Sequence, residues 1–295
     1  MKDETKSLFV SIVGKPNAGK SSLINMLINS KISIVSPKPQ TTRNKITGIL
    51  TEDNIQLVFI DTPGLHKSFN KLSDYMISEI DSSFSGIELS LHVVDVLKKS
   101  IDTTTIEKLK KYNTKAILAI NKIDALKNKS EIIEIIDKYR KLFNYEAIIP
   151  ISAKNSDGRD DLLNELKSRA VPSNFFFSED DITDQTVKSI VGEIVREKLL
   201  YFLDKELPHG TAVQVEKFKE LPNNEVTINA VIYCEKQNHK SIIIGSRGSM
   251  IKKIGVSARK SISDFIECKV NLKLFVKVRE NWRNSMSVLH DLGYV

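Results

Sequence analysis

The sequence predicts an α/β protein in which a doubly wound, mostly parallel sheet is followed by a smaller α+β domain. Short apolar runs alternate with amphipathic stretches through the first half of the chain, as is typical of such a sheet. An acidic stretch that begins beside Pro172 interrupts this alternation. The 295 residues are enough for two domains of ordinary size.

Strands of the first domain are expected where the apolar runs are short and bounded by polar or turn residues. These runs are 8–13, 56–60, 89–94, 116–120 and 148–151. The amphipathic stretches 22–28 and 130–142 predict helices between them. Because ligands bind at the carboxyl ends of the strands in such sheets, functional residues are expected in the loops that follow the runs.

The second half of the chain predicts elements in the order α-β-β-α-α-β. They are a helix at 185–203, strands at 211–219 and 225–234, helices at 239–244 and 250–267, and a strand at 270–278. Pro172 is expected to end the last helix of the first domain. The phenylalanines at 175–177 are expected to pack against one domain. The predicted boundaries are 1–172 for the first domain, 173–184 for a linker, 185–281 for the second domain and 282–295 for a C-terminal tail.

The composition excludes several classes of protein. With 41% hydrophobic and 27% charged residues, the chain is globular rather than disordered. No apolar run reaches the roughly 18 residues that a membrane-spanning helix needs. The charged N-terminus lacks the apolar core of a signal peptide. The cysteines, Cys234 and Cys268, are too few for a disulfide scaffold or a cysteine-based zinc site, so we expect two reduced thiols and no zinc.

The positive charge is concentrated in one segment. The net charge of the chain is +7, but residues 236–283 alone carry +9 and the rest of the chain carries −2. A basic excess confined to one stretch indicates a surface that binds a polyanion. A solvated lysine-rich surface explains the charge equally well, so charge alone leaves both readings open.

The loop after the first strand has the pattern of a phosphate-binding loop. Residues 14–21 match G-x-x-x-x-G-K-S between a predicted strand and a predicted helix. Backbone N–H groups and the helix N-terminus can hold phosphates there, Lys20 can reach the terminal phosphates, and the Ser21 hydroxyl can ligate Mg²⁺. The predicted nucleotide-binding residues are Gly14, Lys15, Pro16, Asn17, Ala18, Gly19, Lys20, Ser21 and Ser22.

The loop that follows residue 60 has the form D-x-x-G. Asp61 can hold Mg²⁺ through water, and the Gly64 N–H can meet a γ-phosphate, so this loop can distinguish a nucleoside triphosphate from a diphosphate. The nucleotide-binding residues predicted here are Asp61, Thr62, Pro63, Gly64 and Leu65.

Two further loops are suited to reading the base. The Asp124 carboxylate can accept hydrogen bonds from both N–H donors on one edge of guanine, which adenine lacks. Asn121 can pair with the other edge or tie loops together, the Lys122 stem can cover the base, and the Ala153 N–H can support the guanine oxygen. Ser152 and Lys154 complete the predicted set. This base-reading pattern argues against an ATPase or a kinase.

Together these four motifs resemble a translation-factor-type GTPase domain. The resemblance implies that Thr42, or Thr41 as a fallback, senses Mg²⁺ in a first switch. It implies Lys20, Thr42 and Gly64 as catalytic residues and Ser21, Thr42 and Asp61 as metal ligands. Leu65 stands where Ras-type GTPases carry a glutamine that orients water, so intrinsic hydrolysis is expected to be slow or supported otherwise. Asn17 resembles an asparagine that binds K⁺ in related GTPases, which is a hypothesis of K⁺ activation.

The basic segment contains G-x-x-G at residues 245–248, between two predicted helices. Such a loop lies close to a nucleic-acid backbone and clamps about four nucleotides. In the order α-β-β-α-α-β this segment resembles a type II KH domain, which favours RNA as the polyanion. Trp282 is expected to anchor the tail rather than to stack on a base. The predicted RNA-binding residues are Ile244, Gly245, Ser246, Arg247, Gly248, Lys252, Lys253, Arg259 and Lys260.

A GTPase domain joined to a C-terminal KH domain resembles the Era family of ribosome-associated GTPases. The likeness covers nearly the whole chain and includes residues 39–43, 61–66, 182–184 and 196–199 and the tail around Trp282. It implies a monomeric cytoplasmic GTPase that uses Mg²⁺ with GTP and helps to assemble the small ribosomal (30S) subunit. In that role the KH domain holds the 3′ end of the ribosomal RNA. The alternative is a membrane-surface GTPase in cell-cycle signalling, since the family allows peripheral membrane contact and the basic segment suits anionic lipid.

Overall fold

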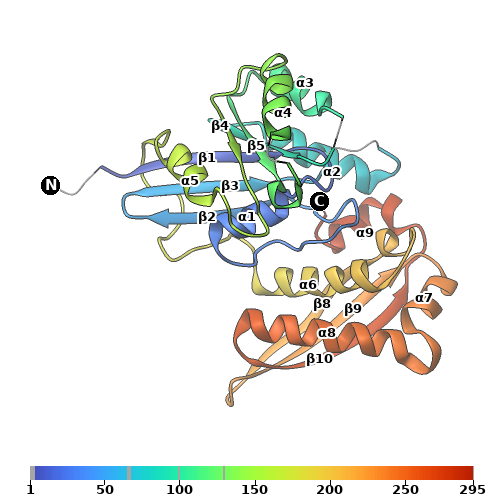
Figure 1. Cartoon of the computed structure of the whole chain (residues 1–295). Helices are drawn as coiled ribbons and strands as arrows, with labels where there is room; N and C mark the ends of the chain where they lie inside the picture. Colours follow the sequence, from blue (N-terminus) through green and yellow to red (C-terminus); the bar gives the residue numbers. More distant parts are fainter. Residues whose placement is uncertain (1–3, 65–67, 99, 129, 295) are drawn as a thin grey trace. The chain divides into compact units, whose positions relative to one another are not determined.

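The computed structural model describes residues 4–64, 68–98, 100–128 and 130–294. Contacts between residues divide the described chain into two compact units (Figure 1). The second unit contains Ile34–Thr41, Ser68–Tyr75 and the described residues from Gln185 onward, and the first unit contains the rest. One boundary between the units therefore falls between Thr41 and Thr42, inside the expected first switch.

The first unit is built on a mostly parallel sheet in the order β2-β3-β1-β4-β5-β6. Strand β2 is antiparallel to β3, and a two-residue strand, β7, pairs antiparallel with β1. The remaining neighbours run parallel, as the alternating pattern predicts. The strands are β1 (Lys6–Val13), β2 (Ile46–Glu52), β3 (Ile55–Asp61), β4 (Leu89–Asp95), β5 (Ala116–Asn121), β6 (Ala147–Pro150) and β7 (Val171–Pro172).

Helices cover both faces of this sheet, so its central strands are apolar on both sides. Side chains of β5 alternate: Ile117 packs in the core with α1 and α5, and Leu118 packs in the core with α3 and α4. The helices are α1 (Lys20–Ile28), α2 (Lys71–Ser82), α3 (Thr103–Lys111), α4 (Glu131–Arg140) and α5 (Arg159–Lys167), with a 3₁₀ turn, η1, at Ile123–Ala125. The residues of α2 up to Tyr75 group with the second unit. The predicted doubly wound architecture is confirmed.

The end of the first unit differs from the prediction at Pro172 and in the expected linker. Helix α5 ends at Lys167, so Pro172 does not end it. Pro172 lies in β7, which pairs with the first residues of β1. The expected linker segment stays with the first unit through Asp184. There the Phe176 ring, although more than half exposed, lies edge-on to Phe9 with the ring centroids 4.8 Å apart, so this phenylalanine contacts the first unit. Strands β2 and β7 had no counterpart among the predicted strands.

The second unit has the predicted order α-β-β-α-α-β. Its elements are α6 (Val187–Phe202), η2 (Pro208–Gly210), β8 (Ala212–Leu221), β9 (Glu225–Cys234), α7 (Gln237–Ile244), η3 (Ser246–Gly248), α8 (Ser249–Ile266), β10 (Lys269–Val278), η4 (Trp282–Asn284) and α9 (Met286–Asp291). Strand β9 is central, antiparallel to β8 and parallel to β10. Helices α6, α7 and α8 share one core with the inner face of this sheet. The short helix α9 was not predicted.

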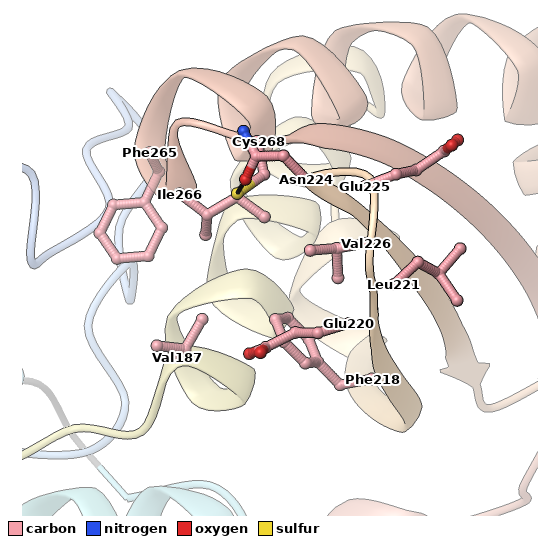
Figure 2. A pocket seen from close by; sticks show the side chains of 10 residues that line it. All are labelled: Val187, Phe218, Glu220, Leu221, Asn224, Glu225, Val226, Phe265, Ile266 and Cys268. Carbon is pink, nitrogen blue, oxygen red and sulfur yellow. Dashed lines mark hydrogen bonds between the residues drawn. The ribbon is translucent and has the colours of Figure 1, made fainter.

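A cavity of about 360 Å³ opens at the hairpin end of this sheet (Figure 2). Most of its walls are apolar, with the Cys268 thiol 3.1 Å from Asn224 Oδ1 at one side. Cys234 lies in the core of the same unit, and neither cysteine forms a disulfide. The cavity is lined by Val187, Phe218, Glu220, Leu221, Asn224, Glu225, Val226, Phe265, Ile266 and Cys268.

The C-terminal tail is anchored by Trp282. Its ring is fully buried, its Nε1–H donates to the Gly210 carbonyl at 3.0 Å, and Tyr294 stacks on it with centroids 6.0 Å apart. A side chain in this position cannot stack on an RNA base. The tail is thus anchored to the second unit through Trp282, as predicted from the sequence.

Replacing Trp282 by alanine should lower the free energy of unfolding by about 3–5 kcal/mol, because a large buried side chain leaves a cavity. Urea denaturation followed by far-UV circular dichroism measures this loss. The control is Met286→Ala in the same tail, whose side chain is about half exposed and should change the value by less than about 0.5 kcal/mol. Equal small effects of both changes would contradict the anchoring role.

Candidate nucleotide site and nucleic-acid interface

The four sequence motifs of the first unit meet at one edge of the sheet. Residues 14–19 follow β1, 61–64 begin at the last residue of β3, 121–124 begin at the last residue of β5, and 152–154 come after β6. Strands β1, β3, β5 and β6 all run in the same direction, so their carboxyl ends lie on the same side of the sheet. Hydrogen bonds join the loops directly: Asn121 Nδ2 donates to the Ala18 carbonyl at 2.9 Å, and the Ala153 N–H donates to Asn121 Oδ1 at 3.0 Å.

The phosphate-binding loop has its shape because two of its glycines leave no room for a side chain. Gly14 has φ +149°, and a Cβ there would lie 2.3 Å from the Val93 carbonyl oxygen of β4. Gly19 has φ +99°, and a Cβ there would lie 2.1 Å from the Asn121 amide nitrogen. Gly19 also precedes α1, so the open N-terminus of this helix faces the loop.

Lys20 lies buried at the start of α1. Its ammonium donates to the carbonyls of Gly14 at 3.0 Å and of Lys15 at 3.3 Å. Burial lowers the pKa of Lys20, while the charges of Asp61 and Asp102 act in the opposite direction. A cation held in this way at the base of a phosphate-binding loop can neutralise charge on terminal phosphates.

Three oxygen-bearing side chains from three segments converge beside Lys20. Ser21 Oγ donates to Asp61 Oδ2 at 2.9 Å and lies 2.8 Å from Thr42 Oγ1. Burial raises the pKa of Asp61, and Lys20 and the neighbouring hydroxyls lower it in part. Among the described residues, Asp61 Oδ1 is a buried oxygen with no hydrogen-bond partner. Hard oxygen donors with an unsatisfied carboxylate oxygen fit a Mg²⁺ site, so the residues present suit the ion that the motifs imply.

The structure separates the two threonines of the expected first switch. Thr42 is buried in the first unit beside Ser21. Thr41 groups with the second unit, where its carbonyl accepts a hydrogen bond from Arg196 and its hydroxyl donates to the Lys38 carbonyl at 2.7 Å. The geometry favours Thr42 over Thr41 near the metal, and its role stays a prediction.

The base-reading loops are held by side-chain contacts. Lys122, with φ +69°, donates to Asp95 Oδ2 at 2.7 Å and to the Asn17 carbonyl at 2.8 Å, so its stem bridges toward the phosphate-binding loop. Asp124 is exposed, and Ser152 Oγ donates to its Oδ1 at 2.7 Å. The sequence analysis missed Asp95; its signal was a carboxylate at the carboxyl end of a predicted strand.

The other predicted residues of the nucleotide site have varied surroundings. A Cβ at Gly64 would lie 2.9 Å from Pro16 Cα, so these two loops touch. The Thr62 hydroxyl donates to the Ile12 carbonyl of β1 at 2.9 Å. Ser22 is half-buried in α1, whereas Lys154 is exposed. The predictions for Leu65 fall outside the described residues.

The G-x-x-G loop of the second unit joins α7 to α8. Gly245 has φ +74°, and a Cβ there would lie 2.8 Å from the Met250 nitrogen, which requires glycine. Arg247 also has a positive φ, +51°, and its side chain is exposed. Ile244 and Gly248 are half-buried, and Ser246 is exposed.

Helix α8 presents opposite chemistry on its two faces. Ile254, Ala258 and Ile262 are buried in the core. The predicted basic residues Lys252, Lys253, Arg259 and Lys260 are exposed on the other side. Lys253 Nζ also lies 4.7 Å from the centre of the Phe202 ring, which engages this lysine with α6. The loop and this helix face together form an exposed basic surface.

Comparisons with known families match parts of both units. Residues 9–122 match the family described as 50S ribosome-binding GTPase, and residues 206–283 match the KH domain family. GTPase Era of Ruminiclostridium cellulolyticum is 46% identical over 98% of this chain and 97% of that protein. GTPase Era of Clostridioides difficile is 44% identical over 98% of both chains.

Two solved structures are similar over 99% of this chain at 32% identity. One is a variant of Aquifex aeolicus Era bound to GDP and aluminium fluoride, with a TM-score of 0.94 and 100% of that chain covered. The other is Era in complex with MgGDPNP and nucleotides 1506–1542 of 16S ribosomal RNA, with a TM-score of 0.93 and 99% covered. Fold and site define a GTP-hydrolysing P-loop protein with a KH domain. The chain belongs to the Era family of GTPases.

Among the described residues, no helix is both long and apolar enough to cross a membrane.

Replacing Asp124 by alanine should weaken GDP binding by about 100-fold or more, because two hydrogen bonds from guanine to a carboxylate are lost. ADP binding should not change. Titration with fluorescent GDP and ADP measures both affinities. Ser152→Ala removes only the hydroxyl that orients Asp124 and should cost much less, and Lys127→Ala nearby should cost nothing. Equal losses for GDP and ADP would contradict base reading by Asp124.

Proposed function

We propose that this GTPase is a GTP-controlled, RNA-binding assembly factor of the small ribosomal subunit, acting as a cytoplasmic monomer. The observation that carries the proposal is the exposed basic surface built on the G-x-x-G loop and α8, in the same chain as the nucleotide site. Its RNA target is proposed as the 3′ end of the small-subunit ribosomal RNA. The support for that target is the related Era complex that contains nucleotides 1506–1542 of 16S ribosomal RNA.

Hydrolysis proceeds as an in-line attack of water on the γ-phosphate. Lys20 neutralises charge on the terminal phosphates, and the Gly64 N–H meets the γ-phosphate. Ser21, Thr42 and Asp61 would hold Mg²⁺, which supplies further charge neutralisation when it is bound with GTP. The preceding residues of the loop provide backbone donors, and Asp124 selects guanine.

The RNA backbone is proposed to lie against the G-x-x-G loop. Gly245 and Gly248 keep the loop free of side-chain bulk, so that phosphates can come near backbone N–H groups. Arg247, Lys252 and Arg259 supply positive charge for the phosphates, which makes binding salt-dependent. The bound form of the nucleotide is proposed to change the affinity for RNA.

Charge reversal at Arg247 tests the RNA surface without strain on Gly245, where any side chain meets the Met250 backbone. Arg247→Glu should weaken binding of an RNA with the 3′-end sequence by about tenfold or more, because a phosphate contact turns into repulsion. Fluorescence anisotropy at fixed salt, with GDP and with a non-hydrolysable GTP analogue, measures the affinity. The matched control is Lys188→Glu, the same charge change at an exposed position of α6.

The outcomes separate the candidate functions. Preference for the 3′-end RNA over a scrambled RNA, lost in Arg247→Glu only, supports the proposal. Equal loss in both variants means a general effect of net charge and contradicts it. Binding to anionic vesicles in a flotation assay without RNA, again sensitive to Arg247→Glu, would favour the membrane-surface alternative.

Potassium activation is a second feature proposed for this site. Asn17, with φ +64°, lies in the phosphate-binding loop, and its carbonyl accepts from Lys122. Hydrolysis should be severalfold faster in KCl than in NaCl at equal ionic strength, and Asn17→Ala should remove the difference. Equal turnover of the wild type in both salts would contradict a role of K⁺.

A further inference from the structure

A buried carboxylate outside the four motifs contacts the phosphate-binding loop. Asp102 precedes α3, and only 3% of it is exposed. Its Oδ2 accepts a hydrogen bond from the Lys15 backbone N–H at 3.1 Å. Its Oδ1 caps α3 by accepting from the Thr105 N–H at 3.2 Å, and the Thr105 hydroxyl donates to Oδ2 at 2.7 Å. One carboxylate therefore caps a helix and also holds the loop.

The peptide between Gly14 and Lys15 lies between two opposite charges. Its N–H donates to the Asp102 carboxylate, and its carbonyl, that of Gly14, accepts from the Lys20 ammonium at 3.0 Å. Hydrogen bonds at the two ends of one peptide polarise each other and strengthen both. The orientation of this peptide, and with it the position of the Lys20 ammonium, therefore depends on Asp102.

Two further contacts prevent this peptide from moving. The Lys15 side chain donates to the Ile101 carbonyl at 3.1 Å, so both its backbone and its side chain are tied to the segment before α3. On the other side, Gly14 lies against the Val93 carbonyl, with no room for a Cβ. The base of the loop is thus held between β4 and the N-terminus of α3.

Asp102 is itself supported by a buried histidine. His92 Nε2 lies 3.4 Å from Asp102 Oδ2, and His92 Nδ1 lies 2.8 Å from the Tyr145 hydroxyl. Burial lowers the pKa of His92, so the ring is neutral at pH 7. Burial alone would raise the pKa of Asp102, but hydrogen bonds from His92 and Thr105 outweigh it and hold the pKa below its ordinary value. The carboxylate is therefore charged when it holds the loop.

We propose that Asp102 is a positioning residue for GTP binding and hydrolysis, which acts through the Gly14–Lys15 peptide on Lys20. Its carboxylate oxygens contact Lys15, Thr105 and His92. It fixes the peptide whose carbonyl holds the Lys20 ammonium, so that the cation stands ready for the terminal phosphates. Its loss therefore affects the ground-state affinity for nucleotide and also the hydrolysis step, in which charge on the phosphates is neutralised by Lys20.

The test uses two variants whose side chains are each able to cap α3. Asp102→Asn places an amide where the second carboxylate oxygen was, so that it can cap α3 or accept from Lys15 but not both. Asp102→Ser also caps a helix well but is too short to reach Lys15. Each should weaken GDP binding by about tenfold and lower kcat by a similar factor, because a hydrogen bond to a charged acceptor is lost. The matched control is Thr105→Val. It removes the hydrogen bond from the Thr105 hydroxyl of α3 to the same carboxylate and leaves the bond from the Lys15 N–H in place.

Three measurements on the full chain decide the outcome: affinity for fluorescent GDP, kcat and KM for GTP, and the melting temperature without nucleotide. Loss of affinity and of kcat in both Asp102 variants, with Thr105→Val within about twofold of the wild type, supports the positioning role. A lower melting temperature with unchanged affinity and kcat shows a role in folding only and overturns it. Equal losses in Thr105→Val also overturn it, because the effect then comes from the end of α3.

Discussion

The close approach of the phosphate-binding loop to strand β4 constrains the rest of the nucleotide site. At Gly14 the backbone passes so near the Val93 carbonyl that a Cβ would stand 2.3 Å away. This contact directs the chain away from β1 with a positive φ, which turns the next peptide toward the N-terminus of α3. The loop then returns to α1 at Lys20. Without glycine at this point the loop could not keep its place between two parallel strands.

Buried charge is the second consequence of that geometry. Lys20 and Asp61 are both removed from water. Burial lowers the pKa of Lys20 and raises the pKa of Asp61, which favours the neutral form of each side chain. Such a pair is costly unless other groups compensate. Loop carbonyls accept hydrogen bonds from Lys20, and hydroxyls donate to Asp61. One Asp61 oxygen nevertheless has no hydrogen-bond partner among the described residues. A site arranged in this way gains from a bound cation and a bound phosphate, which explains why nucleotide and Mg²⁺ suit it together.

The second unit combines an apolar core with an exposed basic surface. One face of α8 is apolar and completes a core with α6 and the sheet, and the other face stays exposed with its lysines and arginines. Gly245 has a positive φ that allows the chain to turn sharply between α7 and α8. The short G-x-x-G loop therefore lies at the start of the helix that carries the basic face. The buried Trp282 ring and its hydrogen bond to the Gly210 carbonyl of η2 tie the tail to the second unit. A basic surface on a rigid support is suited to an extended polyanion.

Residues 14–21, 61–64, 121–124 and 245–248 identified the fold class and the kind of site from sequence, because each motif places required atoms within a few residues. Strong apolar periodicity likewise located the buried strands and α6. The sequence did not indicate β2, β7 or α9. Strand β2 forms a hairpin with the next strand, β3, whereas β7 has only two residues and pairs with β1 at the other end of the first unit. Helix α9 has only six residues. Nor did the sequence show Asp95 or Asp102, because a carboxylate becomes part of a site only through neighbours 27 and 87 residues away. The sequence by itself determined the short motifs, whereas the tertiary structure decided the long-range hydrogen bonds to buried groups.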